Sequence, residues 1–281
     1  MIMTFAMLAL TLSFGLFCAM ALGWWLARKP GQSGLMDVVW SVSTAIAGAV
    51  GALVPADGAV PARQVAVAVL ALAWGGRLGW HIWQRGRNGK HDDPRYAELR
   101  KGWGDKADQR LFLFAEIQAL AALILAQAIA AAARNPAPIA QWSDIAGLAL
   151  IVIAVVGEGV SDAQLARWRS RPESKGQVCE AGLWSVSRHP NYFFEWLGWC
   201  AWPVIAICPD VAPGWVWLTL AAPAMMYALL VHVSGIPPLE AHMLRSRGAR
   251  FADSQRRISA FWPIPRLSNQ KTANENRGPG V

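Results

Sequence analysis

The residues best suited to chemistry lie in one short stretch, SRHPNYFFE, at positions 187–195. Arg188, His189, Asn191, Tyr192 and Glu195 carry groups that donate or accept hydrogen bonds, and the stretch leads directly into an apolar segment. Charged side chains at membrane depth are costly and usually mark functional positions. We therefore expect this stretch to bind a polar or charged ligand.

The order of these residues indicates the kind of ligand. Pro190 disfavours helix at His189 and suits the first turn of the helix that follows. Arg188 and His189 would then lie at a helix N-terminus, where an anion such as a phosphate or carboxylate is stabilised. Asn191 and Glu195 are four residues apart and share a helix face, so the carboxylate could hold an amide or a ribose hydroxyl. A simple interfacial anchor would not explain Asn191 and Glu195.

A second polar face precedes this stretch. Glu158, Asp162 and Arg169 recur at i, i+4 and i+11, which places them on one side of a helix that leaves the membrane. Arg167 and Arg171 fit a solvated helix end, whereas a buried carboxylate at Glu158 needs a partner. The sequence thus marks residues 158–196 as a motif region.

The elements that must position these residues belong to a membrane protein. The chain has 281 residues, of which 54% are hydrophobic and only 16% charged, whereas soluble domains carry about 25% charged residues. The net charge of +8 is typical of cytoplasmic loops of membrane proteins, so nucleic-acid binding is not expected. The four cysteines form no CxxC pair, so we expect neither a metal site nor a disulfide framework.

Seven apolar segments approach the roughly 20 residues that cross a bilayer. They predict an all-α integral membrane protein with seven transmembrane helices at 5–26, 35–54, 63–83, 111–133, 145–160, 192–207 and 215–233. The fifth should continue as a polar helix, and a polar loop should fill residues 84–110. We expect one membrane domain over residues 1–265, including a C-terminal segment at 234–265, and a disordered tail at 266–281.

Basic residues predict the orientation. Eight of them lie in residues 84–110, and most of the rest follow the first and fifth segments or lie after residue 233. The positive-inside rule then places the N-terminus outside and the C-terminus in the cytosol, with the cytosolic loops forming a cofactor pocket. Arg28 and Lys29 follow the first segment and no basic residue precedes it, which favours an uncleaved helix over a signal peptide.

Several motifs also carry a family resemblance. These are GLWSVSRHPNYFFEWLGW after SDAQLARWR, the tail SGIPPLEAHMLRSRGARFADSQRRISAFWPIP, DVVW from Asp37 and DDPRYAELRKGWG from Asp92. Together they cover most of residues 35–265 and resemble the steroid 5-alpha-reductase superfamily, in particular its bacterial DUF1295 branch. The resemblance implies an all-helical fold in the bacterial inner membrane that binds NADPH from the cytosolic side and reduces double bonds in lipids.

The resemblance also implies roles for single residues. The cofactor contacts carried over are Asp162, Arg169, Asn191, Tyr192 and Glu195, and phosphate contacts are expected from Arg87, Arg188 and His189. An arginine-rich site suits a cofactor with a 2′-phosphate, because guanidinium groups match phosphate geometry.

The chain departs from the steroid reductases at the substrate end. Those enzymes are associated with a Gln-Glu pair on an early helix and a Tyr on a later one. Here the second predicted helix offers Asp37, and the third offers His81 and no tyrosine. Asp37 and His81 are the nearest candidates for catalytic residues that polarise a carbonyl or give a proton. A structural pair of polar residues that bond to each other inside the bundle would give the same sequence pattern. Tyr96 is a weaker candidate.

Three functions follow as hypotheses. The first is an NADPH-dependent reductase that transfers a hydride to a conjugated double bond of a steroid-like or other lipid substrate. The second is an S-adenosylmethionine-dependent methyltransferase, because the related isoprenylcysteine carboxyl methyltransferases share an RHPxY motif; Phe194 and the Asp162–Arg169 face argue against it. The third is a non-catalytic lipid-binding membrane protein, which the buried charges Glu158 and Asp37 disfavour.

Overall fold

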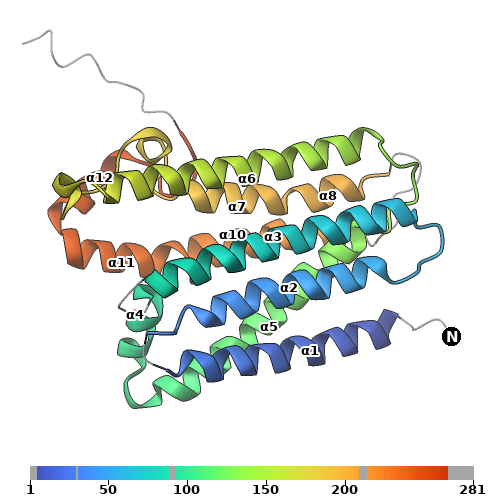
Figure 1. Ribbon diagram of the computed structural model, residues 1–281, viewed down its shortest axis with the longest axis horizontal. Helices are drawn as coiled ribbons and strands as arrows, with labels where there is room; N and C mark the ends of the chain where they lie inside the picture. Colours follow the sequence, from blue (N-terminus) through green and yellow to red (C-terminus); the bar gives the residue numbers. More distant parts are fainter. Residues whose placement is uncertain (1–4, 30, 89–92, 209–213, 215, 265–281) are drawn as a thin grey trace, which may run out of the picture.

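The computed structural model describes residues 5–29, 31–88, 93–208, 214 and 216–264, and all regular secondary structure in these residues is helical (Figure 1). The main helices are α1 (Phe5–Ala27), α2 (Leu35–Leu53), α3 (Pro61–Asn88), α4 (Pro94–Trp103), α5 (Ala107–Ala132), α6 (Trp142–Arg169), α7 (Pro190–Trp199), α8 (Ala201–Ala206), α9 (Val216–Thr219), α10 (Ala221–Ala228), α11 (Ile236–Arg247) and α12 (Ala249–Arg257).

Six helical stretches within these residues are long and apolar enough to cross a membrane. They are Met7–Ala27, Leu35–Leu53, Pro61–Arg87, Arg95–Ala132, Trp142–Arg169 and Val216–Arg247. Their outward faces carry many exposed large apolar side chains, as expected of a surface that meets lipid rather than water. The chain is therefore an integral membrane protein, and the all-helical fold expected from the sequence is confirmed.

Small residues let the helices approach closely. A Cβ on Gly75 of α3 would lie 2.3 Å from the Cβ of Ala45 and 2.7 Å from the Ser41 carbonyl oxygen of α2. A Cβ on Gly157 of α6 would lie 2.3 Å from the ring of Phe194 on α7. Membrane helices associate largely by such packing, because lipid supplies no hydrophobic force between them. These two contacts fix α3 and α6, the helices that carry much of the polar site.

The segment predicted to cross at residues 192–207 is not one continuous helix. It consists of α7 and α8, which meet at Cys200, and both pack along α6 (Figure 1). Pro203 has no N–H to donate to the carbonyl four residues earlier, so the regular helical hydrogen bonding is interrupted here.

The predicted loop at 84–110 also differs from expectation. Helix α3 continues to Asn88, and α4 and the start of α5 fill most of the remainder. Asp93 caps α4 by accepting a hydrogen bond from the backbone N–H of Arg95 at 3.0 Å, with Pro94 in the first turn. The tail predicted at 266–281 lies outside the described residues.

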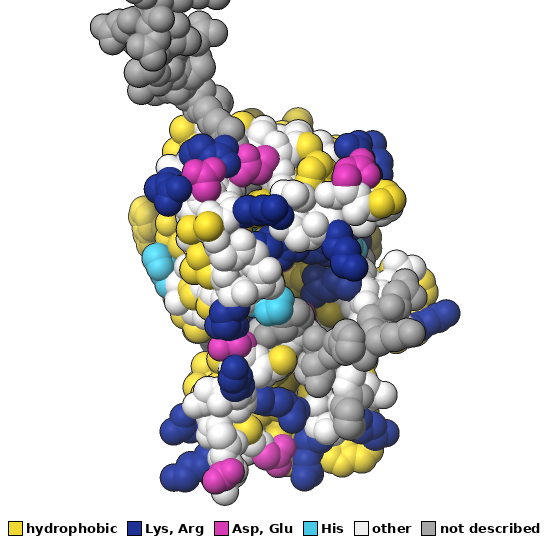
Figure 2. All heavy atoms as spheres, turned by 90° about the vertical axis from the view of Figure 1, so that its left-hand side faces the viewer, with side chains coloured by type: hydrophobic (Ala, Val, Ile, Leu, Met, Phe, Trp, Pro, Cys, Tyr) yellow, Lys and Arg dark blue, Asp and Glu magenta, His cyan; other side chains and the backbone are white. Residues whose placement is uncertain are grey.

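Charged elements gather at one end of the helix bundle. The C-terminal ends of α1, α3 and α6 lie there together with α4, α11 and α12, on the left of Figure 1. Figure 2 views this end, where Lys and Arg side chains outnumber Asp and Glu side chains. The opposite end holds fewer charges, and we refer to the two as the basic end and the far end.

Arg63 organises the far end. Its side chain is buried and forms a two-pronged ion pair with Asp144 of α6, with Nε–Oδ1 and Nη2–Oδ2 distances of 2.8 and 2.7 Å. The same guanidinium donates to the backbone carbonyls of Asn135, Ala137 and Pro138. One side chain thus ties α3 to the α5–α6 connection and to the start of α6.

Replacing Arg63 with Met should therefore destabilise the fold by about 3–5 kcal/mol, because it leaves Asp144 and three carbonyls without their donor. Thermal unfolding in detergent measures the effect as a lower midpoint. Arg167→Met is the matched control, since that exposed guanidinium bonds only to the carbonyl of Ala163 on its own helix. Equal midpoints for the two variants would contradict the organising role of Arg63.

Candidate functional site

Helices α3, α6 and α7 bring polar side chains together at successive levels between the middle of the bundle and the basic end. At the deep level, Arg77 of α3 lies between two carboxylates: Nη2 is 2.5 Å from Glu158 Oε2 and 3.8 Å from Glu195 Oε2. Glu195 also accepts hydrogen bonds from the indoles of Trp74 and Trp199, each at 3.0 Å. The partner that Glu158 requires is thus Arg77.

The middle level lies one helical turn nearer the basic end. His81 Nε2 is 3.4 Å from Asp162 Oδ2, and Asn191 Nδ2 donates to Asp162 Oδ1 at 3.2 Å. All three side chains are partly exposed. They offer two carboxylate oxygens, an imidazole and an amide, a set that suits hydroxyl groups of a ligand.

The outer level is basic. Arg169 at the end of α6 lies within electrostatic reach of Arg85 and Arg247, two charges of the same sign. Arg85 pairs with Asp93 at 3.3 Å, but no described residue forms a hydrogen bond or ion pair with the Arg169 guanidinium. Three guanidinium groups lie near one another here, and that of Arg169 has no partner among the described residues, so an anion would be stabilised at this position. We call the three levels together the polar ladder.

A cavity of about 140 Å³ adjoins the deep level. It lies between α3, α6 and α7 and is lined mainly by apolar side chains, with Arg77, Glu158 and Glu195 as its polar part. Its apolar walls include Leu70, Ile151, Val155, Phe194, Trp199 and Trp202. The site therefore combines a charged outer end with an apolar inner end.

Arg188 and His189 are engaged within the protein rather than turned to an open site. Arg188 donates to Glu240 of α11 from Nε and Nη2 at 2.8 and 3.1 Å and from Nη1 to the backbone carbonyls of Gln255 and Ile258. The His189 ring lies 2.9 Å from the same carboxylate. We call this cluster the latch, because it fastens the loop before α7 to the C-terminal segment.

The latch changes our interpretation of both residues. A phosphate contact was expected from Arg188 and His189, but their donors already serve Glu240 and backbone carbonyls. The His189 ring also stacks on Tyr192, with centroids 5.5 Å apart and an interplanar angle of 14°. Geometry thus assigns the pair to positioning Tyr192 and α7, and it gives the phosphate role no support.

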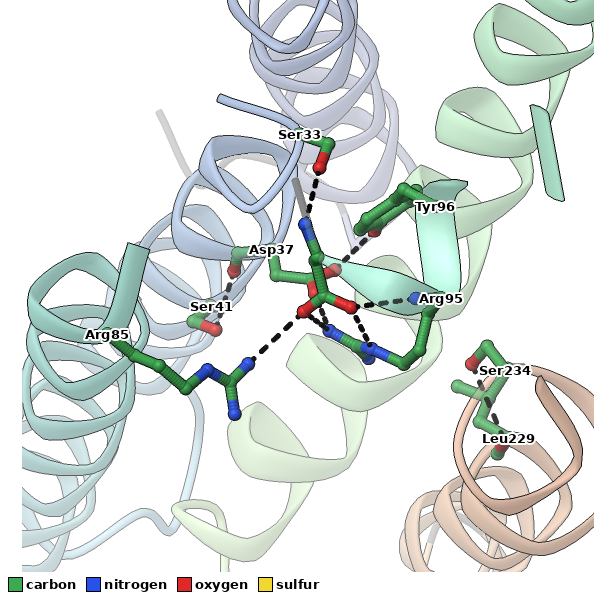
Figure 3. A network of polar contacts seen from close by, with 9 residues as sticks. Ser33, Asp37, Ser41, Arg85, Arg95, Tyr96, Leu229 and Ser234 are labelled. Carbon is green, nitrogen blue, oxygen red and sulfur yellow. Dashed lines mark hydrogen bonds and ion pairs between the residues drawn. The ribbon is translucent and has the colours of Figure 1, made fainter. Parts of the chain in front are cut away.

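Asp37 belongs to another network, shown in Figure 3. Its carboxylate accepts from Arg95 Nη2 at 2.6 Å and from the Tyr96 hydroxyl at 2.5 Å, and Arg95 also pairs with Asp93. Arg85 reaches Asp93 from α3, so the network joins α2, α3 and α4. Burial raises the pKa of Asp93, but the guanidinium of Arg95 more than offsets it and holds this pKa below its usual value.

The two predicted catalytic residues are not paired with each other. Asp37 contacts Arg95 and Tyr96, whereas His81 contacts Asp162 on the polar ladder. Their catalytic roles stay predictions. The ion pair gives Asp37 an evident structural role, which is to hold α4 against α2.

Arg87 lies away from the ladder, and its predicted phosphate contact stays a prediction. Its guanidinium lies 5.1 Å from the ring centroid of Trp83, and the two residues line an exposed depression with Trp80 and Gln84. Arg77, His81 and Arg85 are spaced by four and share the ladder face of α3, whereas Arg87 is displaced from Arg85 by about 200° around the helix. The arginine that reaches the ladder is Arg85.

Sequence reasoning missed Arg77, Trp74 and Arg85 as parts of the site. The signal was the spacing of Arg77, His81 and Arg85, which matches the four-residue spacing of Glu158 and Asp162 on α6. Among the described residues, no group of His, Cys, Asp and Glu is arranged to hold a metal ion.

Fold and side-chain geometry together define an all-helical membrane protein in which polar side chains of α3, α6 and α7 lie at successive levels toward its basic end. The sequence profile of the family described as a protein of unknown function, DUF1295, matches residues 23–258, and the chain belongs to this family, as its motifs indicated. No curated protein and no solved structure matches the chain significantly.

The latch should make stability depend on pH. Burial lowers the pKa of His189 below its ordinary value of about 6.5, and its hydrogen bond to Glu240 offsets this only in part. The fold therefore favours the neutral ring. The resulting stability is present above about pH 6.5 and is lost as pH falls through the lowered pKa, because the unfolded chain then binds the proton more readily.

We accordingly expect the thermal midpoint of the protein in detergent to fall between about pH 7.5 and about pH 5.5, and to fall less in His189→Gln, which cannot titrate in this range. His242→Gln, on the same C-terminal segment, is the matched control and should retain the full pH dependence. The same fall in the His189→Gln variant as in the unmodified protein would contradict this assignment.

Proposed function

We propose that this protein is an NADPH-dependent membrane reductase that reduces a conjugated double bond of a lipid substrate. The observation that carries the proposal is the polar ladder: an outer level with the unpaired Arg169, a middle level of hydrogen-bonding groups, and a deep level that borders an apolar cavity. This order of chemistry matches a ligand with phosphates at one end and an uncharged reactive ring that reaches the deep level, and it leaves the apolar cavity beyond to the substrate.

The side chains present fit that cofactor. Arg85 and Arg169 would hold phosphates, and Arg169 would favour the 2′-phosphate because its guanidinium has no partner among the described residues. Asp162 and Asn191 would hold ribose hydroxyls, with His81 orienting the Asp162 carboxylate. Glu195 would accept from a carboxamide, since a carboxylate has about four acceptor sites and can bind more than its two indole donors.

Once bound, the cofactor would supply a hydride. The chain's own contribution is to align the reactants and keep water away from the deep level, where apolar walls surround Arg77, Glu158 and Glu195. In this arrangement Tyr192 packs behind the site on the latch. Arg188 and His189 act as positioning residues.

In the membrane, the protein would have seven crossings with its basic end in the cytosol. Helices α7 and α8 together run along α6 and would form a seventh crossing beside the six long helical stretches. The positive-inside rule would place the basic end, and with it the outer level of the ladder, in the cytosol of a bacterium, with the protein in its inner membrane. The superfamily of steroid 5-alpha-reductases is the relationship that this proposal assumes.

A methyltransferase that uses S-adenosylmethionine is the second candidate. The specific observation in its favour is the deep level, where two carboxyl groups face one guanidinium and could attract a sulfonium cation. The unpaired Arg169 weighs against it, because S-adenosylmethionine carries no phosphate for that arginine to bind.

Thermal shift separates the candidates, because a ligand that binds only the folded state raises its stability. We expect NADPH to raise the unfolding midpoint of the detergent-purified protein more than NADH does, and S-adenosylmethionine to leave it unchanged. A shift with S-adenosylmethionine and none with NADPH would select the methyltransferase. No shift with any of the three would favour a non-catalytic lipid-binding protein.

Arg169→Gln tests the outer level. A hydrogen bond to a charged group contributes about 1.5–3 kcal/mol, so loss of this guanidinium should reduce the preference for NADPH over NADH about tenfold or more. Dissociation constants from titration of both nucleotides measure the change. Arg171→Gln is the matched control, because that guanidinium lies over the ring of Trp168 instead. An unchanged preference in Arg169→Gln would remove this residue from the site.

A further inference from the structure

The cavity beside the deep level has the size of one ring. Its volume is about 140 Å³, and an apolar protein cavity of about 150 Å³ is known to bind benzene. One of its walls, Val155, is 36% exposed on α6, next to the exposed side chains of Val152 and Val156. The cavity thus borders the lipid-facing surface, and an apolar ligand could enter it from the bilayer.

The polar part of the cavity has an uneven charge balance. Two buried carboxyl groups, Glu158 and Glu195, share one guanidinium, that of Arg77. Two ionised carboxylates beside a single cation leave one negative charge in a medium of low dielectric constant, which is costly. One proton on either carboxyl group restores neutrality.

Hydrogen bonding indicates which carboxyl group holds the proton. Glu195 accepts from the indoles of Trp74 and Trp199 in addition to facing Arg77, and donors of this kind favour its ionised form. Among the described residues Glu158 meets one donor, Arg77 at Oε2, and its carboxyl group also lies within hydrogen-bond reach of Glu195. Two carboxyl groups can share a hydrogen bond only when one of them is protonated, and Glu158, which has fewer donors, is the one that holds the proton.

We infer that this cavity seats a ring-sized or slender conjugated enone group of a membrane lipid, and that Glu158 is the catalytic acid that protonates it. The inference rests on the proposed reductase function and assigns its substrate class and proton donor. The cavity holds about one ring, so a fused four-ring steroid could enter only in part, and we expect a monocyclic or linear enone whose apolar chain extends into the bilayer.

The chemistry balances. Saturation of one carbon–carbon double bond takes one hydride, supplied by the bound nicotinamide cofactor, and one proton. Glu158 gives the proton: its O–H bond breaks as a C–H bond forms at the carbon next to the carbonyl. The resulting carboxylate remains paired with Arg77, and a proton from water restores the acid before the next cycle. Arg77 also has a buried Nε without a hydrogen-bond partner, which suits a carbonyl oxygen of the substrate.

Infrared spectroscopy of the detergent-purified protein tests the proton directly. We expect a carbonyl stretch of a protonated carboxyl group in the unmodified protein that disappears in Glu158→Gln. Asp37→Asn is the matched control and should keep the band, because Asp37 is paired with Arg95. A Glu158→Gln spectrum identical to that of the unmodified protein would overturn the assignment.

A second variant covers the case in which Glu158→Gln does not fold. Arg77→Gln removes the only cation of the deep level, so both carboxyl groups should be protonated and the band should roughly double. No increase would overturn the inference. Thermal shift with NADPH separates this result from the proposed function: absence of NADPH binding defeats the reductase, whereas NADPH binding without the band defeats only the role of Glu158.

Cavity size is tested with enones of graded width. We expect an alkyl-substituted cyclohexenone to stimulate NADPH oxidation by the protein and a four-ring steroid enone to have no effect; the reverse order would overturn the substrate class.

Ala154→Leu, in the cavity wall, should lower the rate with the cyclohexenone about tenfold or more and leave NADPH binding unchanged. Ala163→Leu, exposed on the same helix, is the control, and equal rates in the two variants would place the substrate elsewhere.

Discussion

The arrangement of this protein depends on one constraint: a partly buried guanidinium and two buried carboxyl groups lie between membrane helices. An ion in a low-dielectric medium is stable only if its partner is close and its remaining hydrogen bonds are satisfied. Arg77 therefore fixes the distance between α3 and α6, and Trp74 and Trp199 are oriented so that their indole N–H groups meet Glu195. Gly75 and Gly157 do not lie between these two helices; they let α3 approach α2 and α6 approach α7.

The same requirement explains two of the polar centres outside the ladder, those around Arg63 and Glu240. Arg63 satisfies the backbone carbonyls of a connection at the far end, and Glu240 satisfies the charged loop before α7 at the basic end. Each joins segments that are far apart in sequence. Helix packing in a membrane receives little hydrophobic driving force, so such bonded centres determine which helices are neighbours.

Much of the fold was predictable because the bilayer imposes a length and a composition on each crossing. The apolar segments gave the long helices within a few residues, and the spacing of Glu158, Asp162 and Arg169 gave the ladder face of α6 correctly. The break at Cys200 was missed although Pro203 signals it. Helix α4 was missed because its charged residues are typical of a loop, although Asp93 and Pro94 form a recognisable helix start.

Other parts of the site could not be predicted, because they depend on contacts across the fold. No sequence pattern near Arg188 indicates its partner Glu240, which follows 52 residues later. The sequence therefore predicted an open anion site where the structure has a buried internal ion pair. The choice between Arg85 and Arg87 depended on the register of α3 and not on the RGR run itself. Asp37 and His81 both lie on early helices, but different partners hold them in different networks.

The latch has a consequence for the order in which the chain is made. Ribosomal synthesis delivers Arg188 and His189 well before Glu240, so the long helices before α7 are complete while the latch still lacks its carboxylate. The loop before α7 is fastened only after α11 emerges and folds back. Assembly of the latch at the basic end must therefore follow synthesis of α11.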